Sequence, residues 1–98
     1  MDKGSILDVL RRHEPELRAS GIVHLRLFGS VARGESSSKS DIDLMAELDR
    51  STHPTLLTLV RLENQLTDLL GAKVDLALAD AMKEAVRLRA SREAILAF

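Results

Sequence analysis

The sequence contains no cysteine, tryptophan or tyrosine, and its only aromatic residues are two phenylalanines. Without cysteine, the chain can form neither a disulfide bond nor a metal site with thiolate ligands. With so few aromatic side chains, the core has to be built from leucine, valine, isoleucine and alanine. A tyrosine that takes part in this protein's chemistry must therefore belong to another molecule.

Long apolar runs and a large excess of one charge are also missing. No segment approaches the roughly 20 apolar residues that span a bilayer, and the first residues lead into a charged helix rather than an apolar signal region. We therefore expect a cytoplasmic protein with no membrane contact. The net charge is −1, which gives no concentrated positive field of the kind that nucleic-acid binders use. A small nucleotide or a protein partner fits this charge better than direct nucleic-acid binding.

The 98 residues suffice for one modest core, and we expect a single domain over residues 1–98. Alternating apolar residues predict strands at 23–28, 41–48 and 73–79, and apolar positions three and four residues apart predict helices around them. This order predicts an α/β fold, with a small mixed β-sheet of about three core strands backed by helices. Asp80 is expected to cap the final helix, and Ser91 a last turn that ends at Phe98.

Three aspartates fall on two of these strands. Asp41 and Asp43 are two residues apart on one strand, so their side chains point to the same side. Asp75 lies on the following strand and also points away from the helices. If the strands are neighbours, the three carboxylates lie together and can bind Mg²⁺, which prefers oxygen ligands and completes its shell with water and substrate phosphates. Taken alone, an Asp-x-Asp pair more often decorates a strand end than forms a catalytic site.

A Gly-Ser turn follows the first predicted strand. Gly29 allows the backbone to approach a ligand closely, and the Ser30 hydroxyl with nearby backbone N–H groups can bind phosphate oxygens. The alternative is an ordinary strand-to-helix turn in which Ser30 caps a short helix. Arg33 and Lys39 can neutralise phosphate charge, although surface cations of this kind are usually only solvated.

Together these residues resemble a known signature. Gly29-Ser30, ten further residues and then Asp41-Ile-Asp43 are similar to the signature of the DNA polymerase β-like nucleotidyltransferase superfamily, and in particular to its minimal nucleotidyltransferase (MNT) branch. The resemblance covers essentially the whole chain. The strings that carry it are Phe28-Gly-Ser-Val-Ala-Arg-Gly-Glu, Ser40-Asp-Ile-Asp-Leu44, Lys73-Val-Asp-Leu76 and Arg92-Glu-Ala-Ile-Leu-Ala-Phe98.

This resemblance implies the polymerase β-like nucleotidyltransferase fold and a Mg²⁺-dependent enzyme with two Mg²⁺ ions and ATP as its substrate. Asp41, Asp43 and Asp75 would be the catalytic and metal-binding residues. Gly29, Ser30, Arg33 and Lys39 would bind the nucleotide. The resemblance also implies that this chain is the antitoxin of a toxin–antitoxin system, that it transfers AMP to a tyrosine of a partner HEPN-domain toxin, and that it acts as a homo- or hetero-oligomer.

Three positions depart from the common MNT pattern, and two other functions stay open. Ala94 replaces a glycine, Phe98 a tyrosine and Val31 a frequent arginine, which concerns the packing of the tail and one phosphate contact rather than the acidic cluster. The first alternative is an antitoxin with weak catalysis that neutralises its toxin by binding alone. The second is a transferase for a small molecule, which usually carries an extra domain for its acceptor.

Overall fold

The computed structural model describes residues 2–34 and 41–98. Lys39 and the serine-rich segment 36–38 therefore lie outside the described residues. The elements, in chain order, are α1 (Lys3–Arg12), α2 (Glu14–Ala19), β1 (Ile22–Phe28), α3 (Gly29–Ala32), β2 (Ile42–Leu48), the 3-10 turn η1 (Arg50–Thr52), α4 (Leu56–Leu70), β3 (Val74–Leu78), the 3-10 turn η2 (Ala79–Ala81), α5 (Glu84–Glu93) and β4 (Ile95–Leu96).

The strands form one mixed sheet in the order β3-β2-β1-β4. Strand β2 is central; it is antiparallel to β1 and parallel to β3. This arrangement confirms the predicted α/β fold with a small mixed sheet and places the two strands that carry the aspartates side by side.

The fourth strand was not predicted. The expected final turn capped by Ser91 is wrong, because α5 continues through position 91 and β4 then pairs antiparallel with β1. Backbone bonds fix this tail: the amide of Leu25 donates to the carbonyl of Phe98 at 3.2 Å, and the amide of Ala97 donates to that of Leu25 at 2.8 Å. The chain end therefore extends the sheet rather than closing a helix.

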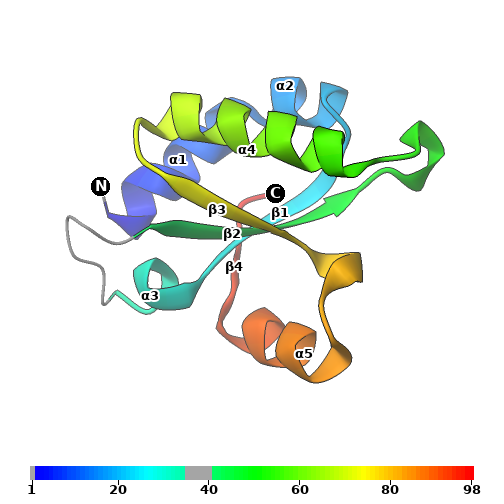
Figure 1. The fold of residues 1–98 in the computed structure, drawn as a ribbon. Coiled ribbons are helices and arrows are strands. Elements are labelled where there is room, and N and C mark those ends of the chain that lie inside the picture. The colour runs from blue at the N-terminus through cyan, green and yellow to red at the C-terminus, as the bar shows by residue number, and fades with distance from the viewer. Residues whose placement is uncertain (1, 35–40) are drawn as a thin grey trace.

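Helices α1, α2 and α4 cover one face of the sheet, and α3 and α5 lie on the other side (Figure 1). The main core lies between this face of the sheet and helices α1, α2 and α4. Its fully buried side chains come from alternate strand positions and from the inward faces of these helices. They include Ile6, Leu10, Leu17, Leu25, Leu27, Leu44, Leu62 and Leu66. Strand alternation with Leu25 and Leu27 would place Val23 on this face, but Val23 is 37% exposed because the β1–β2 register shifts between Ile22 and His24. The face of β2 and β3 that carries Asp43 and Asp75 therefore lies opposite this aliphatic core.

The opposite face of the sheet is only partly open. Met45, Ala79 and Ala90 form a small second cluster there, against which Phe28 and Ala94 pack. Met45 is buried on the same strand face as Asp43, which the alternation alone did not suggest. Helix α5 therefore covers one part of this face, and the aspartates occupy another.

The structure shows how helices α1 and α5 begin. Asp2 caps α1 by accepting a hydrogen bond from the amide of Ser5 at 2.8 Å. The predicted cap of α5 by Asp80 is wrong, because Asp80 lies in η2 and α5 begins only after Lys83. Among the described residues, no helix combines the length and apolar character needed to cross a membrane, and the expected cytoplasmic location stays a prediction.

Candidate functional site

The centre of the candidate site is a pair of aspartates on neighbouring strands. Asp43 and Asp75 are register partners on the parallel strands β2 and β3, whose backbones lie about 4.8 Å apart in such sheets. The residues that follow them, Leu44 and Leu76, are also register partners and are buried in the main core. Because strand side chains alternate, Asp43 and Asp75 both point to the opposite face. Asp41 lies just before β2 and is exposed.

The turn after β1 lies directly against Asp43. Phe28, the last residue of β1, is the register partner of Asp43, and Gly29 follows it with a left-handed φ of +76°. A Cβ atom added to Gly29 would overlap Asp43 Oδ2 and lie 3.0 Å from Asp43 Cγ. Only glycine gives both this backbone conformation and this close approach.

Ser30 occupies the first turn of the short helix α3 and is half-buried. The predicted helix cap by Ser30 is wrong, because α3 begins at Gly29 after an extended Phe28 and has no side-chain cap bond. The serine is therefore held beside the turn by the helix backbone rather than by a capping role.

Asp43 lies in a strongly acidic environment. Its pKa is raised, first because partial burial disfavours the charged carboxylate and then because of the negative charges of Asp75 and Asp41. The positive charge of Arg33 acts in the opposite direction and lowers the pKa of Asp43. The other two predicted carboxylates and one of the two predicted phosphate-binding cations therefore act electrostatically on Asp43.

Two neighbouring residues join the predicted site through ion pairs. Arg33 Nη1 contacts Glu93 Oε2 at 3.1 Å, and Lys73 Nζ lies 3.7 Å from Asp41 Oδ2. Sequence reasoning assigned no role to Glu93 or Lys73. Each pair joins residues that are distant in the chain, so no local pattern could have indicated it; the only signal was that both residues fall within strings that carry the MNT resemblance.

The carboxylates do not form a closed metal cage. Within residues 2–34 and 41–98, no three His, Cys, Asp or Glu side chains are close enough together to hold a metal ion between them. The donor chemistry nevertheless fits Mg²⁺, which takes oxygen ligands and usually needs only one or two protein carboxylates beside water and phosphates. The crowding of negative charge around Asp43 also favours a cation there.

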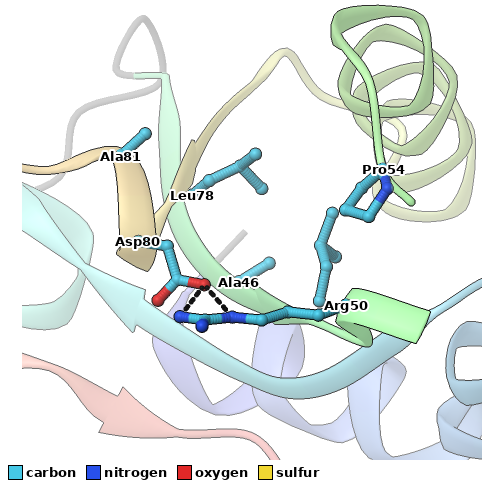
Figure 2. A pocket seen from close by; sticks show the side chains of 7 residues that line it. Ala46, Arg50, Pro54, Leu78, Asp80 and Ala81 are labelled. Carbon is cyan, nitrogen blue, oxygen red and sulfur yellow. Dashed lines mark hydrogen bonds and ion pairs between the residues drawn. The ribbon is translucent and has the colours of Figure 1, made fainter. Parts of the chain in front are cut away.

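A separate hollow of about 210 Å³ lies at the other end of the same strands. Figure 2 shows its lining, which consists of Ala46, Leu48, Arg50, Pro54, Leu78, Asp80 and Ala81. Arg50 and Asp80 form an ion pair at 3.1 Å on its rim. The hollow lies at the carboxyl ends of β2 and β3, whereas Asp43 and Asp75 lie near their amino ends. Its mostly apolar lining is unsuited to a triphosphate.

Known proteins resemble the chain in sequence. It matches the family described as nucleotidyltransferase domain over residues 6–97. A candidate protein adenylyltransferase of Methanocaldococcus jannaschii is 42% identical over 79 residues, which are 80% of this chain and 79% of that protein. The protein adenylyltransferase MntA of Thermococcus cleftensis is 34% identical over 91 residues, which are 92% of this chain and 90% of MntA.

Solved structures share the fold. A candidate minimal nucleotidyltransferase superposes with a TM-score of 0.76 at 39% identity, covering 97% of this chain and 95% of that one. A toxin–antitoxin complex with AMP-PNP has a TM-score of 0.71 at 20% identity, covering 100% of this chain and 73% of the matched chain. A structure of a tri-AMPylated HEPN toxin of Shewanella oneidensis in complex with MNT antitoxin has a TM-score of 0.66 at 18% identity, covering 94% of this chain and 71% of the matched chain. At this identity, the last two show the fold alone.

Proposed function

The chain belongs to the nucleotidyltransferase domain family, as a minimal nucleotidyltransferase, and on that premise we propose that it transfers AMP from ATP to a hydroxyl group of a partner protein. The family resemblance and the fold expected from the sequence are confirmed, and the chain is a nucleotidyltransferase. Relatives named protein adenylyltransferases support the choice of a protein as acceptor. The observation that carries the proposal is the register pairing of Asp43 with Asp75 beside Gly29.

Each residue of the site has a proposed task. Asp41 and Asp43 would hold Mg²⁺ together with the triphosphate, and Asp75 would serve a second Mg²⁺ beside the acceptor. When bound, Mg²⁺ neutralises phosphate charge and lowers the pKa of a coordinated hydroxyl. Gly29 lets the chain approach the phosphates closely, and Ser30 offers a hydroxyl to them.

The proposed reaction is a displacement at the α-phosphorus of ATP. The acceptor oxygen forms a bond to this phosphorus, the bond to the bridging oxygen breaks, and pyrophosphate leaves with its electron pair. Asp75, an exposed carboxylate, would help remove the proton of the acceptor hydroxyl. Arg33 and Lys39 would balance the negative charge of the phosphates, and of these two Arg33 already acts on Asp43.

We further propose that the acceptor is a tyrosine of a HEPN-domain toxin and that this chain is its antitoxin. A protein of the same fold is found in complex with a tri-AMPylated HEPN toxin, and the chain has no tyrosine of its own. Residues 1–98 would act as one nucleotidyltransferase domain, and the assembly with the toxin would be a hetero-oligomer.

The test is to incubate the purified chain with ATP, Mg²⁺ and a HEPN-domain toxin from the same organism, and to locate AMP on both proteins by mass spectrometry. We expect AMP on a tyrosine of the partner and a loss of its toxicity. The variant that combines Asp41→Ala with Asp43→Ala should give no adduct. Loss of toxicity without an adduct would support neutralisation by binding alone, and an adduct on a serine or threonine of this chain would contradict the tyrosine acceptor.

A further inference from the structure

An ion pair joins the end of α3 to the end of α5. Arg33 Nη1 lies 3.1 Å from Glu93 Oε2, and the two side chains are 42% and 43% exposed. Both helices lie on the side of the sheet that faces away from the main core (Figure 1). An exposed pair of this kind contributes little to the stability of a fold, because solvent screens it.

The backbone fixes both partners independently of this contact. Arg33 follows α3, which starts directly after β1. Glu93 ends α5, and two residues later Ile95 pairs with Leu27 of β1. Ala94, which follows Glu93, and Phe28 at the end of β1 both pack against the second cluster. The same end of β1 therefore holds both backbones in place, and the ion pair restricts the rotamers of the two side chains.

The arginine that Glu93 contacts is anchored beside the acidic cluster. The amide of Arg33 donates to the carbonyl of Gly29 at 3.2 Å, and Gly29 lies directly against the Asp43 carboxylate. The positive charge of Arg33 also acts on Asp43, so the arginine lies near the carboxylate beside which the phosphates would bind. A long arginine side chain loses rotamer entropy when it is fixed, and a contact that orders it beforehand removes part of that cost from ligand binding.

We propose that Glu93 is a positioning residue for nucleotide binding, whose carboxylate holds the guanidinium of Arg33 at the triphosphate side of Asp43. This inference rests on the proposed function, because it requires that Arg33 meets phosphate. Glu93 itself touches neither nucleotide nor acceptor. Its removal should weaken Mg-ATP binding about fivefold, the size expected for one side chain that must be ordered on binding, and should leave kcat nearly unchanged.

The experiment is a double-mutant cycle on the full chain, with the dissociation constant of Mg-ATP measured by titration calorimetry. The proteins are the wild type, Glu93→Gln, Arg33→Ala and the double variant. Glu93→Gln should raise Kd about fivefold in the wild-type background and should have no effect where Arg33 is already alanine. This coupling separates positioning from a structural role of Glu93 in docking α5, because a structural loss would weaken binding equally in both backgrounds.

A matched control comes from another exposed pair. Arg18 Nε and Glu14 Oε2 lie 2.8 Å apart with side-chain exposures of 43% and 37%, on helix α2 and away from the aspartates. Glu14→Gln should therefore change thermal stability about as much as Glu93→Gln without changing Kd. The transfer assay should show the Glu93→Gln effect in KM for ATP rather than in kcat.

Three results would overturn the role of Glu93. They are an unchanged Kd in Glu93→Gln, a lower Kd, which would mean that Glu93 competes with the phosphates for Arg33, and equal losses in both backgrounds of the cycle. With normal transfer by the wild type, each of these leaves the proposed function intact. A wild-type chain that binds no Mg-ATP would refute both proposals, and that outcome is distinct from the other three.

Discussion

The α-carbon of Gly29 lies against the carboxylate of Asp43. A Cβ atom at position 29 would overlap Asp43 Oδ2 and approach Asp43 Cβ to 3.1 Å. Gly29 also has a φ of +76°, in the left-handed region that favours glycine. The glycine of the Gly-Ser turn and the second aspartate of the Asp-x-Asp pair are therefore packed against each other, although residues 30–42 lie between them in the sequence.

Gly29→Ala should consequently damage nucleotide binding beyond its effect on folding. The new methyl group must displace the Asp43 carboxylate, so we expect the affinity for Mg-ATP to fall at least about tenfold, or 1.4 kcal/mol. Gly71→Ala is the matched control: Gly71 has a φ of +66° and open space around its Cβ position. Both variants should lose about 1–2 kcal/mol of folding stability to backbone strain, and calorimetry should find weaker binding only in Gly29→Ala. Equal affinities in the two variants would contradict the packing argument.

Strand alternation is a local rule, so the sequence alone could predict which strand face carries the aspartates. Residues two apart on β2 share a face, and Leu44 and Leu76 mark the buried side of their strands. The adjacency of β2 and β3, which brings Asp43 opposite Asp75, is a tertiary fact. From alternation alone, the three carboxylates were expected to lie together only if the strands are neighbours. The expectation that the strands are neighbours came from the family resemblance.

The parts that sequence reasoning missed depend on long-range contacts. Strand β4 has two residues, too few for a period to be visible, and it exists because β1 offers a free edge to pair with. Met45 is buried on the polar face of β2 because α5 returns over it. The contact of Glu93 with Arg33 follows from the same return of the chain. In each case, the deciding partner lies far along the chain.

Asp43→Asn should stabilise the ligand-free fold. Because the pKa of Asp43 is raised, the folded chain binds more protons than the unfolded chain in the window above the ordinary aspartate pKa, and the free energy of unfolding falls as pH rises through it. Asparagine removes this charge, and we expect Tm at neutral pH to rise by about 1–4 °C. Thermal denaturation without nucleotide and divalent metal measures the change.

The same pair of proteins provides the pH test. Well below pH 3.8, the ordinary aspartate value, Asp43 is protonated in the folded and unfolded chains alike, so the gain from Asp43→Asn should vanish. Asp68→Asn, at an exposed position of α4, is the control for the removal of a carboxylate that is not buried. A destabilised Asp43→Asn at neutral pH would show that the carboxylate makes a favourable contact that outweighs its burial and the neighbouring charges.

Phe98→Ala should destabilise the fold strongly. Phe98 is only 9% exposed, and the guanidinium carbon of Arg18 lies 5.0 Å from the centroid of its ring. Truncation of a buried phenylalanine costs about 3–5 kcal/mol, which urea denaturation measures directly. Leu96→Ala, in β4 but 47% exposed, should cost less than about 1 kcal/mol. Similar losses in the two variants would mean that the tail acts through backbone pairing alone.

Binding of ATP should require a divalent metal, because the site otherwise places the negative charges around Asp43 against those of the phosphates. Titration calorimetry in Mg²⁺ and in EDTA measures the difference, which we expect to exceed about tenfold in Kd, or 1.4 kcal/mol. The variant that combines Asp41→Ala with Asp43→Ala should lose this metal-dependent part. Equal affinity for ATP in Mg²⁺ and in EDTA would refute the proposed metal site.

Asp75→Asn should separate nucleotide binding from transfer. Asp43 lies against Gly29 and Asp41 precedes it by two residues, whereas Asp75 comes from β3 and is exposed, so its proposed partner is the acceptor side of the reaction. The variant should bind Mg-ATP within about tenfold of wild type, or 1.4 kcal/mol, while transfer to the partner falls at least about a hundredfold, or 2.7 kcal/mol of transition-state stabilisation. Asp80→Asn, at an exposed position beyond the other end of β3, is the control and should change neither the affinity for Mg-ATP nor the rate of transfer. Normal transfer by Asp75→Asn would remove Asp75 from the catalytic set, and a joint loss of binding and transfer would make it a ligand of the nucleotide-associated metal instead.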